Sequence, residues 1–175
     1  MDTLLTKRLI LRLFEVDDLQ DFYQYAKVEG VGERAGWRHH KSIEETKMVL
    51  NSFIENKDVY AIVLKANQRV IGSIGVHQRS KDEHTKEIGY VLSKDYWNQG
   101  LMSEAVERVI DYCFKELHLS VLTCGHFVEN TTSEKIIKKV GFKRVEVGKY
   151  YSQNMDQEFD HYKYQLTKNS YFNKS

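Results

Sequence analysis

The stretch Tyr96-Trp97-Asn98-Gln99-Gly100-Leu101-Met102-Ser103-Glu104-Ala105 decides how this chain folds, because a glycine there joins an extended segment to an amphipathic helix. Upstream, residues 87–92 alternate in the manner of a β-strand, and downstream apolar residues recur at helical spacing as far as Cys113. The first turn of a helix has backbone N–H groups without partners, and the helix dipole favours negative charge there. The stretch therefore predicts an anion-binding turn of the kind that holds a pyrophosphate.

The composition is typical of one globular domain, which we expect to span residues 1–175. Of the 175 residues 41% are hydrophobic, and 26 Lys and Arg against 25 Asp and Glu give a net charge of +1. This balance provides no global attraction to nucleic acid or to an anionic membrane surface. No apolar run approaches the roughly 20 residues of a membrane helix, and the first residues lack the regions of a signal peptide. We expect a cytoplasmic protein with no nucleic-acid or membrane partner.

Cysteine and histidine do not show the spacing of metal ligands. Cys113 falls in an apolar helix and Cys124 in an apolar strand, without C-x-x-C spacing, so we expect buried, unreactive thiols. His39 and His40 are adjacent, but neighbouring histidines rarely hold a metal without a third ligand. The sequence predicts no metal site and no disulfide.

The predicted elements follow the order β-α-α-β-β-β-α-β-α-β-β. Strands are expected at residues 7–13, 59–64, 70–76, 87–92, 121–127, 142–147 and 160–166, and helices at about residues 19–26, 43–54, 100–117 and 131–140. Such an order predicts an α+β (mixed α/β) fold, with a mixed sheet of about seven strands flanked by about four helices.

This order, with three local motifs, resembles the GNAT superfamily of acetyl-CoA-dependent N-acetyltransferases. The motifs are Glu87-Ile88-Gly89-Tyr90, the stretch 96–105, and Glu129-Asn130-x-x-Ser133 running on to Gly141-Phe142. Together they are most similar to the branch that acetylates the N-terminal serine or alanine of ribosomal proteins. The resemblance covers about residues 8–167 and implies a GNAT-like fold with a strongly twisted central sheet.

The resemblance also implies acetyl-CoA as co-substrate. Its pyrophosphate is expected on the backbone N–H groups of Gln99, Gly100, Leu101, Met102 and Ser103, and its pantetheine arm on the strand between Tyr90 and Leu92 and on Asn130. Asn130 is equally a favoured N-cap for the helix that begins at Thr131, and the two roles are compatible. The family's loop often has Gln or Arg where Trp97 stands and Gly or Ala where Met102 stands. Because the backbone does the binding, the loop can tolerate Met102.

Acetyl transfer requires a group that takes a proton from the acceptor ammonium, and Glu87 is the first choice. Alternation along its strand places Glu87 on the face opposite Ile88, Tyr90 and Leu92. Gly89 is a suitable place for a β-bulge that frees strand N–H groups. The competing interpretation is that Glu87 faces solvent and pairs with a lysine across the sheet.

The departing thiolate requires a proton, which many family members supply from a tyrosine four residues before the Gly-Phe pair. That position is Ile137 here. Ser133 is then the best remaining donor by resemblance to the ribosomal branch, and water is an alternative because a thiol is fairly acidic. Ile137 also keeps open a different function, that of a non-catalytic acyl-CoA-binding or regulatory module.

The acceptor side is less defined by the sequence. Trp37 lies in the region that borders the acceptor entrance in the family, so it is expected either to bind substrate or to anchor the core. The expected reaction acetylates a primary amine, on a protein N-terminus or a small molecule, by direct attack in a ternary complex. The tyrosines between Tyr150 and Tyr164 are typical of sheet packing or of a subunit surface, so a homodimer is among the assemblies that the sequence allows.

Overall fold

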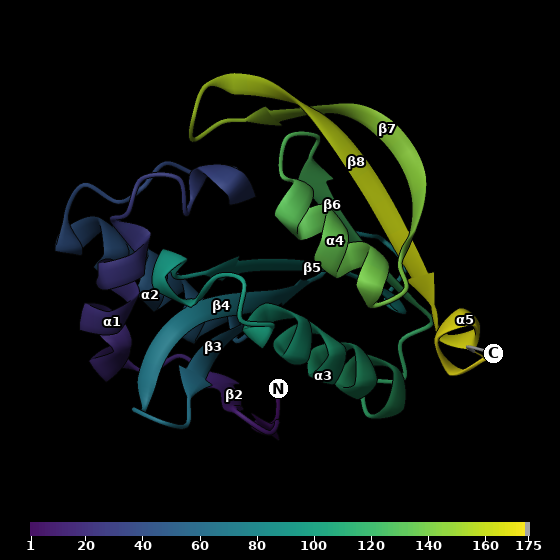
Figure 1. Cartoon of the computed structure of the whole chain (residues 1–175), viewed down its shortest axis with the longest axis horizontal. Helices are drawn as coiled ribbons and strands as arrows, with labels where there is room; N and C mark the ends of the chain where they lie inside the picture. The colour runs from purple at the N-terminus through teal and green to yellow at the C-terminus, as the bar shows by residue number, and fades with distance from the viewer. Residues whose placement is uncertain (174–175) are drawn as a thin grey trace.

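Residues 1–173, which the computed structural model describes, form an eight-stranded sheet in the order β1-β2-β3-β4-β5-β6-β8-β7 (Figure 1). The strands are β1 (Leu4–Leu5), β2 (Leu9–Leu13), β3 (Val59–Leu64), β4 (Arg69–His77), β5 (Thr85–Leu92), β6 (Val121–Phe127), β7 (Lys143–Ser152) and β8 (Gln157–Thr167). The α-helices are α1 (Leu19–Ala26), α2 (Ile43–Asn56), α3 (Leu101–Lys115), α4 (Thr131–Lys139) and α5 (Lys168–Phe172). Strands β5 and β6 run parallel, whereas the other neighbouring pairs run antiparallel.

The α+β mixed fold predicted from the sequence is confirmed, with two short elements added. Strand β1 has two residues and helix α5 has five, and both are too short to produce a periodic pattern. Strand β7 continues to Ser152, five residues past its predicted end, and β8 begins three residues earlier than predicted; together they form the long arched hairpin of Figure 1. Most β7 residues are exposed on both faces, so they lack the alternation that would indicate their full length. Among residues 1–173, no helix is both long and apolar enough to cross a bilayer.

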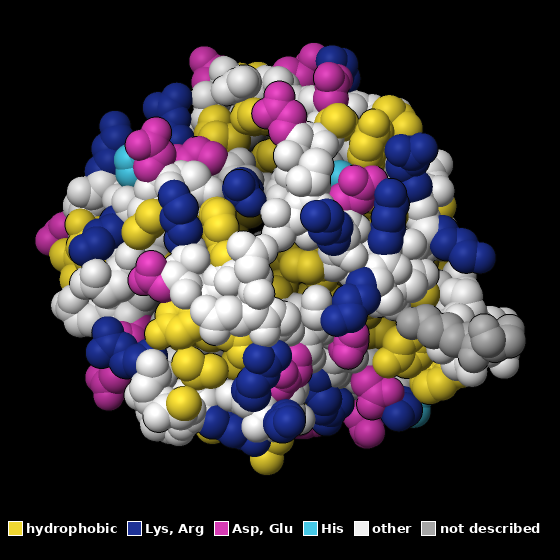
Figure 2. All heavy atoms as spheres, in the orientation of Figure 1, with side chains coloured by type: hydrophobic (Ala, Val, Ile, Leu, Met, Phe, Trp, Pro, Cys, Tyr) yellow, Lys and Arg dark blue, Asp and Glu magenta, His cyan; other side chains and the backbone are white. Residues whose placement is uncertain are grey.

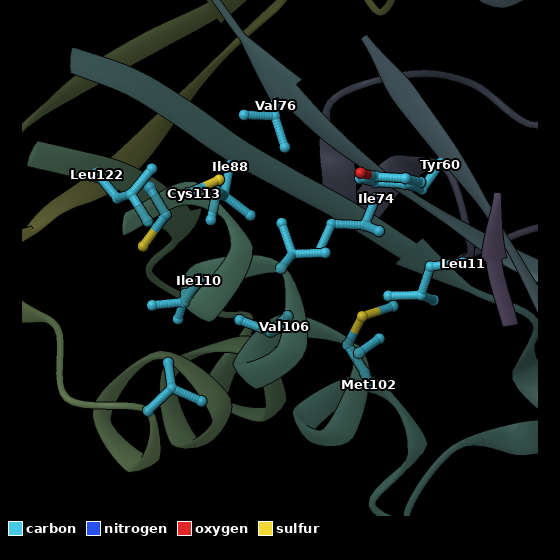
Figure 3. Close-up of a cluster of buried hydrophobic side chains, with 14 of the residues drawn as sticks. Leu11, Tyr60, Ile74, Val76, Ile88, Met102, Val106, Ile110, Cys113 and Leu122 are labelled. Carbon is cyan, nitrogen blue, oxygen red and sulfur yellow. The ribbon is translucent and has the colours of Figure 1, made fainter. Parts of the chain in front are cut away.

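Two hydrophobic clusters occupy opposite faces of the sheet. Between the sheet and α3, Ile74, Ile88 and Leu122 meet Val106 and Ile110, each at most 3% exposed (Figure 3). On the other face, the residues of α1 and α2 pack against β3, as Phe22, Leu50 and Ala61 illustrate. Burying a side chain of the size of Leu or Ile stabilises the fold by about 2 kcal/mol.

Both cysteines belong to the cluster beneath α3. Cys113 and Cys124 are buried and free, as predicted. Burial raises the pKa of the Cys113 thiol to about 12 and also raises that of Cys124. Neither sulfur is therefore a thiolate near neutral pH.

The parting of β5 from β6 positions the site. The two strands pair only over residues 85–87 and 121–123, although each continues for several residues more. The Leu92 carbonyl accepts a hydrogen bond from Trp97 Nε1 and so points away from β4. Since backbone directions alternate along a strand, Tyr90 directs its backbone groups the same way, toward the space that β6 leaves.

The predicted bulge at Gly89 is wrong. The pairing of β4 with β5 is continuous from Gly72 opposite Leu92 to His77 opposite Glu87. The departure of β6, rather than a bulge, frees the backbone of β5. A register shift occurs instead between β3 and β4, at Ile62 and Val63.

Candidate active site

A cavity of about 700 Å³ opens where β5 and β6 separate. Its walls come from the start of α3, the start of α4, the ends of β4 and β5, and the segment around residues 31–37. Figure 2 shows a hollow near the centre of this view, with hydrophobic side chains at its base and Lys and Arg side chains around its rim. The cavity thus joins residues from both faces of the sheet.

Helix α3 turns the backbone of its first residues toward this cavity. Gly100 has φ +73°, a left-handed conformation that favours glycine. The helix's hydrogen bonding begins with Glu104 N–H donating to the Gly100 carbonyl, so the N–H groups of residues 101–103 have no partner within the helix. The side chains of Leu101 and Met102 are buried in the core (Figure 3 labels Met102), so their backbone is what they offer to the cavity. This arrangement fits a pyrophosphate.

A clamp of hydrogen bonds fixes the loop before α3. Glu104 accepts from Arg8 Nε at 2.7 Å and from the Thr6 hydroxyl at 2.6 Å. Arg8 Nη1 also donates to the Gln99 carbonyl at 2.9 Å. Burial opposes ionisation of Glu104, but the hydrogen bonds from Thr6 and Arg8 outweigh it and lower its pKa. Gln99 does not line the cavity; its side-chain amide donates to the Asp95 carbonyl, so Gln99 supports the loop.

Trp97 ties the same loop to β5. Its indole Nε1 donates to the Leu92 carbonyl at 2.8 Å, and the Arg34 guanidinium lies 4.4 Å from the centre of its ring. Arg34 and Trp97 both line the cavity. The tryptophan that replaces the family's usual Gln or Arg thus has a structural role, and the stacked Arg34 supplies a positive charge at the cavity wall.

Tyr90 and Ser133 both line the cavity and contact each other there. The Tyr90 hydroxyl and Ser133 Oγ lie 2.8 Å apart, and either can donate. Burial raises the pKa of Tyr90 and outweighs the opposing effect of the Ser133 hydrogen bond, so the phenol keeps its proton. Asn130 accepts from Ser133 N–H at 3.2 Å, which confirms it as the N-cap of α4. Ile137 is 1% exposed in the core and does not line the cavity.

Glu87 lies on the opposite face of β5 from Tyr90, as the alternation predicts. It lines the cavity, and its cross-strand neighbour is His77, whose Nδ1 is 2.6 Å from Asp58 Oδ2. A Cβ at Gly89 would meet nothing within 4 Å, so open space lies beside Glu87. Within residues 1–173 no ion pair joins Glu87 to a lysine.

The sequence comparisons identify the family. The family model of the acetyltransferase (GNAT) domain matches residues 8–143. This chain belongs to the GNAT acetyltransferase family. It is 28% identical to the uncharacterized N-acetyltransferase p20 of Bacillus licheniformis, over 98% of this chain and 99% of that protein. It is 33% identical to the uncharacterized N-acetyltransferase YnaD of Bacillus subtilis, over 79% and 81% of the two chains.

Solved structures share the GNAT fold across nearly the whole chain. A GNAT-family acetyltransferase from Bacillus anthracis superposes with TM-score 0.88 at 26% identity, covering 96% of this chain and 99% of that one. The ribosomal-protein-S5-alanine acetyltransferase of Vibrio fischeri gives 0.76 at 22%, covering 98% and 99%. The spermidine N-acetyltransferase of Vibrio cholerae, in complex with CoA and spermine, gives 0.80 at 18%, covering 96% and 100%. The protein is accordingly an N-acetyltransferase of a family that uses acetyl-CoA.

Trp37 lines the same cavity from the segment that precedes α2. Its ring packs 5.1 Å from the His40 ring and over Gly32, where a Cβ would overlap it. Trp37 therefore packs against the core, as one of its two expected roles requires, and its position in the cavity wall leaves substrate binding as a prediction. The nearby histidines have separate partners: His39 Nδ1 meets Glu33 and His40 Nδ1 meets the Thr46 hydroxyl, each at 2.8 Å.

Proposed function

We propose that this GNAT N-acetyltransferase moves the acetyl group of acetyl-CoA directly to a primary amine within a ternary complex. The observation that carries the proposal is the continuity of one cavity. It runs from the unpaired N–H groups of α3, past the Tyr90–Ser133 hydroxyl pair, to Glu87 on the other face of the sheet. Donor and acceptor can then meet where β5 and β6 part.

In this scheme the backbone holds the donor. The N–H groups of Leu101, Met102 and Ser103 bind the pyrophosphate, because they are unpartnered within the helix and lie at the positive end of its dipole. The freed backbone of β5 between Tyr90 and Leu92, with Asn130, binds the pantetheine arm. Acetyl-CoA supplies an acyl group activated as a thioester.

Side chains of the protein remove a proton from the acceptor and supply one to the leaving sulfur. Glu87 takes a proton from the acceptor ammonium, directly or through water, so that the nitrogen regains its lone pair. The hydroxyl pair of Ser133 and Tyr90 provides the proton for the sulfur. The two cysteines are buried with raised pKa values, which supports direct transfer over an acyl-cysteine route.

We further propose a peptide N-terminus, or a small molecule with no positive charge besides the reacting amine, as acceptor, in preference to a polyamine. The motif resemblance to the ribosomal branch supports a protein N-terminus. The cavity walls support it too, since Arg34 and Arg79 line them alongside Glu87 and would repel a polycation.

The test is release of free thiol from acetyl-CoA by the purified protein. Peptides beginning with Ala or Ser, single L-amino acids and spermidine form the panel. We expect release with a peptide or amino acid that exceeds release with spermidine. Tight CoA binding without thiol release for any amine would instead support a non-catalytic acyl-CoA-binding module.

A further inference from the structure

A second titratable pair lies on the acceptor side of the cavity, beyond the groups already assigned. His77, at the end of β4, brings its Nδ1 to 2.6 Å from the carboxylate of Asp58, just before β3. The His77 side chain is 26% exposed and the Asp58 side chain 36%. Asp58 therefore fixes the orientation of the ring and leaves Nε2 as its free nitrogen.

His77 Nε2 lies over a part of the sheet where the residues are glycines. A Cβ on Gly75 would overlap His77 Nε2, so the ring can lie there only because residue 75 is glycine. Gly75 is paired with Gly89 on β5, and a Cβ on Gly89 would meet open space. The paired glycines therefore leave this part of the sheet surface without side chains of its own. The His77 ring lies over Gly75, and Glu87 is on the same face of β5 as Gly89.

His77 and Glu87 are also direct cross-strand partners. Opposite residues of an antiparallel pair have Cβ atoms about 5 Å apart and point to the same face. Both line the cavity, and a group resting over Gly89 lies beside both. Within residues 1–173 no set of three His, Cys, Asp or Glu is grouped to hold a metal ion, so these side chains do not form a metal site.

We propose that the Asp58–His77 pair is the acceptor of the proton that Glu87 draws from the substrate ammonium. The inference rests on the proposed function and adds His77 as a catalytic residue and Asp58 as its positioning residue. An ordinary carboxylate, with a pKa of about 4, is a weak base toward an ammonium, whereas an ordinary imidazole, at about 6.5, is better matched to neutral pH.

The groups present balance the protons of the reaction. One N–H bond of the ammonium breaks, and its proton passes through Glu87 to His77 Nε2, while Asp58 offsets the imidazolium charge. The neutral nitrogen forms a bond to the thioester carbon and the C–S bond breaks; the Tyr90–Ser133 hydroxyl pair gives a proton to the sulfur and is reprotonated by the second nitrogen proton. His77 then returns its proton to solvent, which leaves an amide, CoA thiol and one released proton.

Other charged groups line the same cavity. Arg79 follows β4, Arg34 lies on the segment before α2, and His161 and Lys163 come from β8. Lys163 pairs with Glu146, and burial lowers the pKa of His161. Because Asp58 is the group hydrogen-bonded to His77, removing it should change His77 more than removing any of these.

Kinetics with benzylamine as acceptor test the proposal. We expect His77→Gln to lower kcat about 100-fold near pH 7, with recovery at alkaline pH, where benzylamine is already neutral. Asp58→Asn should lower kcat about tenfold near pH 7. CoA affinity should not change, and the matched control His84→Gln, in the exposed turn before β5, should behave as the unaltered protein. Glu87 and His77 act in the same proton-transfer path. The Glu87→Gln/His77→Gln double variant should therefore have a kcat only slightly below that of the slower single variant.

The proposal would be overturned if His77→Gln and Asp58→Asn kept the kcat of the unaltered protein at every pH while Glu87→Gln lowered it. That result would leave Glu87 as the sole base. A second readout does not depend on turnover. Side-chain 15N NMR of the CoA-bound protein should show the His77 signal moving when benzylamine is added, and moving less in Asp58→Asn. If no amine supports thiol release, the proposed function fails. A His77 15N signal that does not move when benzylamine is added would separately overturn the proposed role of the Asp58–His77 pair.

Discussion

The hydroxyl oxygens of Tyr90 and Ser133 lie 2.8 Å apart and join β5 to α4 across the cavity. The family resemblance leads us to expect a tyrosine on α4 at position 137. This chain has Ile137 there, and its side chain is buried in the core. A phenol is nevertheless present, and it comes from the neighbouring strand. The fold thus offers a protonated hydroxyl pair beside the proposed sulfur position without the usual helix residue.

We predict that Tyr90→Phe and Ser133→Ala each lower kcat by about tenfold or more. The two hydroxyls form one hydrogen-bonded unit, so the double variant should be no slower than about the slower single one. Stopped-flow or steady-state thiol release measures this, with CoA affinity as a parallel readout. Tyr162→Phe, outside the cavity lining, is the control. Rates that stay at the level of the unaltered protein in both single variants would assign the proton to water.

Gly100→Ala should weaken CoA binding about fivefold. The residue has φ +73°, and a side chain there is strained by about 1 kcal/mol, although an added Cβ would lie 3.6 Å from its nearest neighbour, Nη2 of Arg8. Relief of that strain moves the first N–H groups of α3 from their places. Titration calorimetry with CoA provides the measurement. Gly148→Ala, in β7 with ordinary contacts, should bind as before; equal effects at both positions would contradict the assignment.

Glu104→Gln should reduce the free energy of unfolding by about 2 kcal/mol at neutral pH, because a charged acceptor for Thr6 and Arg8 is lost. The folded pKa of Glu104 lies below its ordinary value. Its contribution is therefore fully present above the ordinary glutamate pKa of about 4.3 and disappears as the pH falls through the lower folded value. Urea unfolding between pH 7 and pH 3 should show the difference between the variant and the unaltered protein shrinking with acidity. Glu107→Gln, exposed on the same helix, should show no such trend.

Glu87→Gln should slow acetylation most at pH values where the acceptor amine is charged, and least where it is neutral. CoA affinity should stay the same, because Glu87 lies on the face of β5 opposite Tyr90 and is proposed to act on the acceptor. The measurement is the pH profile of kcat/KM, with Glu83→Gln in the exposed turn as control. A variant profile parallel to that of the unaltered protein would remove Glu87 from proton transfer.

Local signals carried most of the fold prediction. The left-handed Gly100 before α3, the Ser42 hydroxyl that accepts from Glu45 N–H, and the Asn130 N-cap are all encoded within four residues. Periodicity then located the buried strands and helices. It missed the far end of β7, whose residues are mostly exposed on both faces, the first residues of β8, and all of β1 and α5, which are too short.

The site depends on contacts that local patterns do not record. Tyr90 meets Ser133 across 43 residues, and the Arg8–Glu104 clamp spans 96. The Asp58–His77 pair requires the register of β3 against β4, and the open backbone of β5 requires the departure of β6. The alternation along β5 did predict that Glu87 and Tyr90 lie on opposite faces of the strand. Which partners those faces meet follows only from the packed structure.

A crystal structure of the protein with CoA tests the central claim most directly. We predict pyrophosphate oxygens within hydrogen-bonding distance of the N–H groups of Leu101, Met102 and Ser103, the pantetheine arm along β5, and the sulfur beside the Tyr90–Ser133 pair. CoA bound outside the space between β5 and β6, with those N–H groups facing solvent, would contradict the account.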